Sequence, residues 1–211
     1  GNSEQQTKRS LQRKIEWLSK QARIAHIKEL NSGNFQTSYV QFDEMETFEH
    51  TKMKPLSIAI AVVVRTGLIV DIRVATMNCH GPLAEASRLK YGPREDTRKD
   101  ACEKVMNSVK KVAEPRFTIA CDSKNTYPGI IKAAVPHAKI KAVLAARSKV
   151  ADDPLFAINT LCANLRADLA VLSRKTMATL KKKDTLQDLL NIYIAFNNGY
   201  DIAAFTNREE E

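Results

Sequence analysis

The sequence predicts an α/β domain with a mixed β-sheet, preceded by a helical segment. Residues 39–48 alternate apolar and polar side chains, as a half-buried strand does. Two apolar runs, 56–65 and 68–76, are joined by Thr66-Gly67, so the three strands form an antiparallel meander. After residue 97, helix-like and strand-like segments alternate, which is typical of an α/β arrangement.

An amphipathic helix is predicted over residues 4–30, where apolar residues recur at three- and four-residue steps and the other faces are basic. Gly33 follows as a C-cap. The helix could lie along DNA phosphates, or it could link this chain to a further module, and we slightly favour the linker. The predicted division is a basic helical segment or linker over residues 1–36 and a core over residues 37–211.

The region 78–98 is predicted to be a polar loop. After it, helices and strands alternate along the chain. We expect helices over 97–112 and 127–135 and strands over 117–121 and 140–145. Asp153 is the predicted N-cap of a long helix over 155–180, and Asp184 caps the last helix, which stops at residues 197–199. A three-stranded meander followed by helix, strand, helix and strand is the order of the RNase H-like fold.

Composition narrows the kinds of partner. The chain has 211 residues and a net charge of +9, which favours a polyanionic partner, most commonly nucleic acid. No apolar run approaches the length of a membrane span and no signal peptide is visible, so we expect a cytoplasmic protein without a membrane partner. The four cysteines are scattered, which fits a reduced compartment and indicates neither a disulfide framework nor a zinc site.

Two aspartates are the candidate site. Asp122 ends a buried strand, where ligands of α/β proteins are usually bound, and Asp43 lies at the centre of the first strand. In this strand order the two would converge. Asp122 could instead only cap a turn, and Glu44 could be the true first acid. Asp43 is preferred because Phe42 should face the core. Glu44, two residues later, then points to the same covered face of the strand, and Asp43 points to the other face.

Paired carboxylates suit divalent-cation chemistry. Mg²⁺ (or Mn²⁺) prefers hard oxygen ligands and keeps several waters, so Asp43 and Asp122 are the predicted metal ligands. Bound ions of this kind can activate a water or hydroxyl in phosphodiester chemistry. Like charges this close repel, so the pair needs a metal or a raised pKa.

Short motifs in a fixed order resemble a known family. They are Gln41-Phe42-Asp43-Glu44-Met45, Cys121-Asp122-Ser123 with Tyr127-Pro128, Asn164-Leu165-Arg166, and Leu172-Ser173-Arg174-Lys175-Thr176. Over about residues 39–200 the chain resembles the DDE-type transposases of small bacterial insertion sequences, in the insertion-sequence-one-like group. The resemblance implies Mg²⁺-dependent DNA cleavage and strand transfer at transposon ends and a DNA target. It also implies a homo-oligomer, with a dimer expected, in the bacterial cytoplasm in association with the nucleoid.

The third catalytic position departs from the family pattern. The resemblance implies a Glu seven residues before Arg166, and Asn159 stands there, completing a catalytic set with Asp43 and Asp122. Asparagine offers a carbonyl oxygen but no charge and no general base. Asn159 could be a variant ligand, Asp152 or Asp153 could supply the third acid, or the protein could bind DNA without cleaving it. Asn159 could also be only a polar residue on an exposed face of the helix.

Basic residues on and after the long helix are the predicted DNA contacts, because lysine and arginine suit phosphates. The predicted set is Arg166, Arg174, Lys175, Lys181, Lys182 and Lys183. A solvated helix face explains the three-lysine run equally well. The sequence therefore leaves a metal-dependent transposase core and a DNA-binding or regulatory protein derived from one. A third hypothesis is an unrelated basic α+β protein, in which Asp43 and Asp122 would lie far apart.

Overall fold

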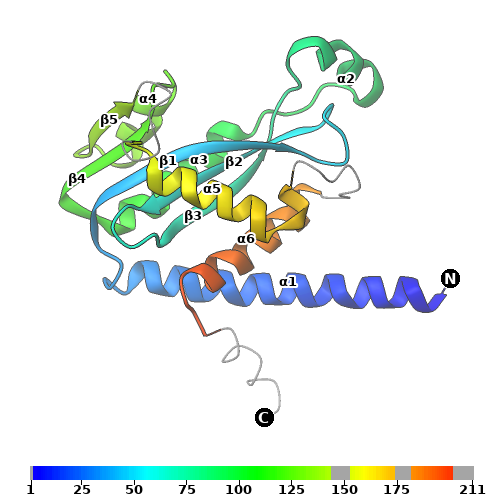
Figure 1. Ribbon diagram of the computed structural model, residues 1–211, viewed down its shortest axis with the longest axis horizontal. Helices are drawn as coiled ribbons and strands as arrows, with labels where there is room; N and C mark the ends of the chain where they lie inside the picture. The colour runs from blue at the N-terminus through cyan, green and yellow to red at the C-terminus, as the bar shows by residue number, and fades with distance from the viewer. Residues whose placement is uncertain (1, 144–152, 174–181, 202–211) are drawn as a thin grey trace.

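The computed structural model describes residues 2–143, 153–173 and 182–201, and it confirms the mixed α/β prediction (Figure 1). A five-stranded sheet has the order β3-β2-β1-β4-β5. The strands are β1 (Thr37–Phe48), β2 (Pro55–Val63), β3 (Ile69–Thr76), β4 (Ala113–Asp122) and β5 (Lys139–Val143). The α-helices are α1 (Asn2–Asn31), α2 (Ala84–Tyr91), α3 (Arg98–Val112), α4 (Tyr127–Ala134), α5 (Phe156–Asp168) and α6 (Lys183–Asn197), with 3₁₀ turns η1 (Gly81–Leu83) and η3 (Ala170–Leu172).

The sheet combines a meander with two parallel strands. Strands β1, β2 and β3 pair antiparallel, as their alternating and apolar patterns predict. Strand β4 returns parallel to β1 on its other side, with Phe42 opposite Cys121, and β5 pairs parallel to β4. Since β1 is central, a residue in its middle lies next to the carboxyl end of β4.

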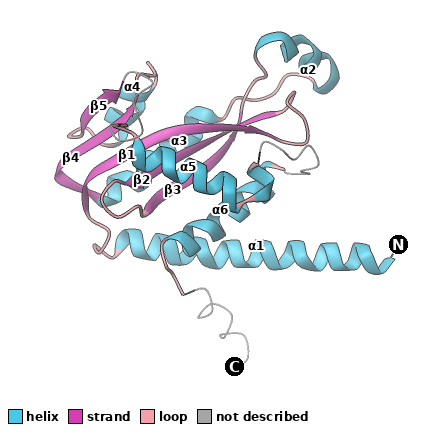
Figure 2. Cartoon of the chain, in the orientation of Figure 1, coloured by secondary structure: helices cyan, strands magenta, loops and turns pink. Residues whose placement is uncertain are grey.

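Helices cover both faces of the sheet (Figure 2). On one face, α3 and α4 bury a cluster that includes Phe42, Met106 and Tyr127. On the other face, α5 and α6 bury a second cluster that includes Met45 and Ile158. The alternation of β1 therefore places successive side chains in different cores, as the sequence predicts for residues 40–45.

Helix α1 packs along α6 beside the edge strand β3, and its N-terminal part extends past the sheet (Figure 1). Fully buried Asp71 on β3 accepts hydrogen bonds from Arg23 of α1 at 3.0 Å and from Ser108 of α3 at 2.6 Å. His26 of α1 lies within 2.9 Å of the Tyr200 hydroxyl and 2.8 Å of the Val70 carbonyl oxygen. These contacts hold α1 against the core, while the predicted boundary at residues 36 and 37 stays a prediction.

Several local predictions are wrong. Region 78–98 is not only loop, because it contains η1 and α2, whose residues have no strong apolar stripe. The helix predicted over 155–180 ends at Asp168, where the backbone of Leu169 turns extended, and residues 174–181 lie outside the described chain. Asp153 and Asp184 are not N-caps, since Leu155 and Lys182 hold those positions without a side-chain cap.

Over the described ranges, no helix combines the length and apolar character that a membrane crossing requires.

Candidate active site

Asp43 and Asp122 directly follow paired residues of two neighbouring parallel strands. Phe42 of β1 lies opposite Cys121 of β4, and both side chains enter the α3 and α4 core. The next residue in each strand points the other way, because strand side chains alternate. Both aspartates therefore leave the sheet on the α5 face, on strands whose ordinary spacing is about 4.8 Å.

The environment of Asp43 disfavours its charge. Burial, together with the nearby charges of Asp122 and Glu44, raises the pKa of Asp43 from 3.8 to about 6. The backbone N–H of Glu44 donates to Asp43 Oδ1 at 2.7 Å and partly opposes the shift in pKa. A carboxyl held this way gains from a cation, which would neutralise the repulsion.

Asp122 ends β4 at the turn into α4. Its Oδ1 accepts a hydrogen bond from the backbone N–H of Lys124 at 3.1 Å, so it does form the turn contact considered from the sequence. The turn occupies one carboxylate oxygen. Turn formation and ligand binding are therefore compatible roles for Asp122.

The two aspartates fit one hard divalent cation. Among the described side chains, the hydrogen bonds to Asp43 and Asp122 involve only one oxygen of each, Oδ1. Mg²⁺ keeps several waters and accepts a site with one or two carboxylates. No cluster of three or more His, Cys, Asp or Glu suited to a metal occurs within residues 2–143, 153–173 and 182–201. A third protein carboxylate is thus not provided by the described part of the chain.

Glu44 lies on the opposite face and has a different role from the aspartates. Its side chain is only 7% exposed and forms an ion pair with Lys124. Ser57 donates to Glu44 Oε1 at 2.8 Å, and the Tyr127 hydroxyl donates to Oε2 at 3.1 Å. Burial and then the charge of Glu44 raise the pKa of Tyr127 far above its ordinary value. Glu44 therefore ties β1 and β2 to the turn that carries Asp122.

Gln41 fixes the start of α5 over β1. Its Nε2 donates to the Pro154 carbonyl at 2.8 Å, and its Oε1 accepts from the backbone N–H of Ile158 at 2.9 Å. The Gln41 side chain is buried, so it satisfies two main-chain groups that water could not reach. This contact sets where the helix lies relative to Asp43, two residues further along β1.

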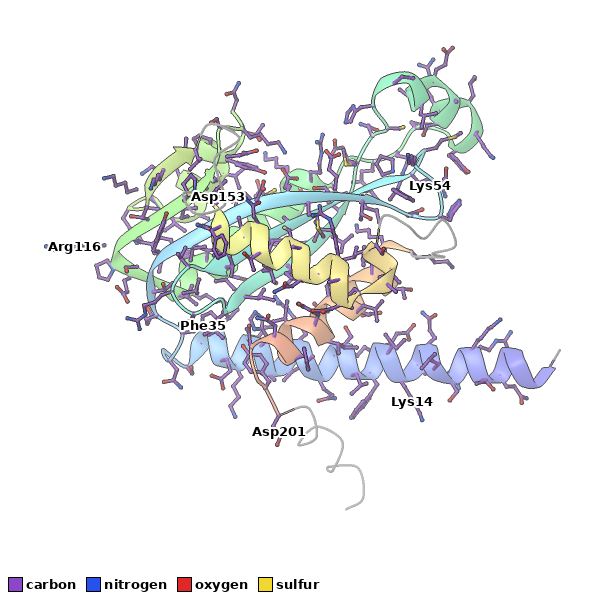
Figure 3. The ribbon with its side chains drawn as sticks, in the orientation of Figure 1. Lys14, Phe35, Lys54, Arg116, Asp153 and Asp201 are labelled. Atoms are coloured by element: carbon purple, nitrogen blue, oxygen red, sulfur yellow. The ribbon has the colours of Figure 1, made fainter. Side chains whose placement is uncertain are left out.

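Asn159 lies in the first turn of α5, near Asp153. Its Nδ2 donates to Asp153 Oδ2 at 2.7 Å, and the side chain is exposed. Asp153 stands at the beginning of α5 (Figure 3), where its Oδ1 also accepts from the backbone N–H of Leu155 at 2.9 Å. Both Asp153 oxygens are thus used within the helix start. Asp152, the other alternative acid, lies outside the described residues.

Cys162 and Arg166 follow Asn159 along the same side of α5. Burial and the charge of Asp43, partly opposed by Arg166, raise the pKa of Cys162 to about 11. Both charged groups are thus close enough to act on the thiol. The spacing from Asn159 to Arg166 is close to two helical turns, so both lie on one side of α5, and the effect of Asp43 on Cys162 indicates that this side lies near Asp43.

The other predicted DNA-binding residues are only partly described. Lys182 and Lys183 lie at the beginning of α6, where Lys182 is exposed and Lys183 is half-buried. Arg174, Lys175 and Lys181 lie outside the described residues. The structure therefore brings Arg166 to the aspartate face and leaves the grouping of the predicted basic set a prediction.

Sequence reasoning missed the supporting roles of Gln41, Glu44, Lys124 and Tyr127. Gln41, Glu44 and Tyr127 occur in the motifs that carry the family resemblance. Their place in those motifs was the one indication in the sequence that they matter. Their partners lie far away in sequence: Glu44 contacts Lys124 across 80 positions and Gln41 contacts Ile158 across 117. Contacts of that range have no local pattern from which they could be inferred.

No family model, no curated protein and no solved structure matches the chain.

Proposed function

We propose that this chain is the catalytic core of a DDE-type transposase, which cleaves and joins DNA strands with Mg²⁺ or Mn²⁺. The observation that carries the proposal is the position of Asp43 and Asp122, one residue beyond the Phe42–Cys121 pair on neighbouring parallel strands. Their shared face and the raised pKa of Asp43 support a cation site. The motifs around both aspartates support the family.

An RNase H-like fold is the finer proposal for the architecture. The order β3-β2-β1-β4-β5 supports it, since three antiparallel strands are followed by two parallel ones. Helices on both faces and the aspartate in the centre of β1 are consistent with the same fold. Fold alone assigns no activity, so the function depends on the site.

In this proposal, Asp43 and Asp122 hold the ion, and the protein around them sets their geometry. When bound, Mg²⁺ supplies activation of the attacking oxygen and neutralisation of charge at the leaving oxygen. Glu44 and Lys124 position the turn that carries Asp122. Gln41 positions α5, from which Arg166 faces the site and could bind a DNA phosphate.

DNA as the partner is supported by charge. The net charge of +9 is sufficient to attract a polyanion, and the exposed lysine that precedes α6 is one of the cations that could contact it. We place the protein in the bacterial cytoplasm, in association with the nucleoid, and expect a dimer at paired transposon ends; these assignments depend on the family resemblance.

The test is cleavage and strand transfer on labelled transposon-end DNA with Mg²⁺, Mn²⁺ or Ca²⁺. We expect products with Mg²⁺ or Mn²⁺, and we expect Asp43→Asn and Asp122→Asn each to abolish them. Exposed Asp201→Asn is the matched control and should retain activity. DNA binding without any product across all metals would refute the enzymatic proposal.

A second candidate is a transposase-derived protein that binds DNA without cutting it. Asn159 favours this candidate, because it replaces the third carboxylate and its amide is bonded to Asp153. Asn159→Glu separates the two hypotheses. If the missing carboxylate is what prevents cleavage, this variant should gain metal-dependent activity that the wild-type protein lacks.

A further inference from the structure

A cavity of about 420 Å³ opens on the α5 face of the sheet, next to the aspartates along β1. Met45 lines it and lies two residues after Asp43, so both side chains leave β1 on the same face. The apolar part of the lining also includes Phe48, Pro55 and Leu172. We refer to this space as the Arg166 cavity, because Arg166 enters it from α5.

Two cationic side chains line the cavity and have no hydrogen-bond or ion-pair partner within the described part of the chain. Across the described residues, the side chains of Arg166 and Lys52 donate no hydrogen bond and form no ion pair. Arg166 is half-buried and its guanidinium nitrogens still reach solvent, so they are available to the oxygens of an anionic ligand. Glu46 also lines the cavity, but its side chain is exposed.

The cavity lies on the same face of β1 as Asp43 and begins two residues further along the strand, at Met45. Helix α5 runs along β1, with its first turn over Gln41 and Arg166 in the cavity that Met45 lines (Figure 1). Cys162 lies one turn before Arg166 and experiences the charges of both Asp43 and Arg166. A DNA strand with a phosphate at the aspartates would therefore reach the cavity with an adjoining nucleotide.

We propose that the Arg166 cavity binds one nucleotide of the DNA strand, next to the phosphate at the cation that Asp43 and Asp122 hold. Arg166 and Lys52 bind its phosphate, since guanidinium and ammonium groups both suit phosphate oxygens. The apolar wall of Met45, Phe48 and Leu172 receives the sugar and base. A volume of about 420 Å³ lies in the range of small-ligand pockets. This inference rests on the proposed function.

The experiment measures binding of a short fluorescein-labelled DNA duplex by fluorescence anisotropy, in Ca²⁺ instead of Mg²⁺ so that a divalent cation is present without cleavage. Dissociation constants are determined over a series of salt concentrations for the wild-type protein, Arg166→Gln and Lys52→Gln. Lys104→Gln is the matched control, because Lys104 is an exposed lysine of α3 on the opposite face of the sheet. Competition by dTMP and by inorganic phosphate tests the apolar wall.

We expect each cavity variant to weaken binding several-fold and to reduce the salt slope by about 0.9, the value for one lost phosphate contact. The control should keep the wild-type slope, and dTMP should compete at a lower concentration than phosphate. Lys52 lies on an exposed hairpin, so Lys52→Gln tests the cavity even if Arg166→Gln folds poorly.

Three results would overturn the inference, and they are distinguishable from each other. If both cavity variants keep the wild-type salt dependence of DNA binding, the cavity is not a nucleotide site, while the proposed function stays intact. Equal competition by dTMP and phosphate would refute nucleotide binding in favour of a simple anion site. A wild-type protein that does not bind DNA would refute both the inference and the proposed function.

Discussion

At the scale of single residues, Asp43 should lower the stability of the folded protein near neutral pH. Its folded pKa of about 6 exceeds the ordinary 3.8, so the folded state holds the proton more tightly. The contribution of Asp43 to stability is therefore most favourable below pH 4 and is lost as the pH rises through 6. Asp43→Asn should stabilise the protein by about 1–3 kcal/mol at pH 7.5 and have little effect at pH 3.5.

Urea unfolding in EDTA at the two pH values measures this difference for Asp43→Asn, with Asp201→Asn as an exposed control. A destabilising Asp43→Asn substitution at pH 7.5 would contradict the assignment of Asp43 as a strained, ligand-ready carboxylate.

Glu44 should differ from Asp43, because its carboxylate stabilises the folded protein and substitutions of Glu44 should lower the free energy of unfolding. Glu44→Gln can keep the hydrogen bonds with Ser57 and Tyr127 but loses the ion pair with Lys124. Glu44→Ala loses all three contacts and leaves buried polar groups without partners. We expect Glu44→Ala to lower the free energy of unfolding by about 2–4 kcal/mol, and Glu44→Gln by clearly less. Chemical denaturation measures both; equal small effects would refute the role of Glu44.

At the scale of elements, α5 and α6 are each attached to the sheet through the side-chain amide of a glutamine. Gln41 of β1 bonds the first turn of α5, whereas Gln187 of α6 accepts from the Val74 N–H at 2.9 Å and donates to the Ile72 carbonyl at 3.0 Å. In each case one side chain satisfies a main-chain donor and a main-chain acceptor. These pairs set the positions of the helices over the sheet.

Gln41→Ala should therefore loosen α5 selectively. Two main-chain groups of the helix start lose their partners, which should cost about 2–3 kcal/mol. Hydrogen exchange should accelerate at Ile158 and its neighbours, while β1 and β4 keep their protection. Gln187→Ala is the matched control, since it should accelerate exchange at β3 and α6 instead. Uniform acceleration in both variants would contradict selective attachment.

At the scale of the whole molecule, the position of α1 should depend on pH through His26. Burial lowers the pKa of His26 from 6.5 to about 4, so the folded state holds a neutral imidazole. Stability from this group is complete above pH 6.5 and is lost as the pH falls toward 4. His26→Gln removes the titration. The free energy of unfolding of the wild-type protein, relative to that of His26→Gln, should fall by about 1–3 kcal/mol between pH 7.5 and pH 5.

Urea unfolding of the wild-type protein and His26→Gln at pH 7.5 and pH 5 measures this change. A stability difference that stays constant between the two pH values would indicate that His26 does not titrate on unfolding. The slope from His26 opposes that from Asp43, so each variant must be compared with the wild-type protein at the same pH.

Local patterns predicted the sheet and its two aspartates, because strand alternation and the apolar run before Asp122 are written in consecutive residues. The end of α5 was not predictable in this way. Leu169 and Leu172 continue the apolar stripe, but the chain turns at Leu169 after Asp168, whose carboxylate accepts from the Tyr193 hydroxyl at 2.9 Å. The connections made by Gln41 and Glu44 also depend on distant residues, so only the folded chain reveals them.

The most direct test of the central claim measures Mn²⁺ binding in the absence of DNA, with electron paramagnetic resonance as the detection method. We expect a bound ion in the wild-type protein that is lost in both Asp43→Asn and Asp122→Asn and retained in Asp201→Asn. Binding unchanged by either substitution at Asp43 or Asp122, or absent from the wild-type protein, would contradict the claim that the two aspartates form one divalent-cation site.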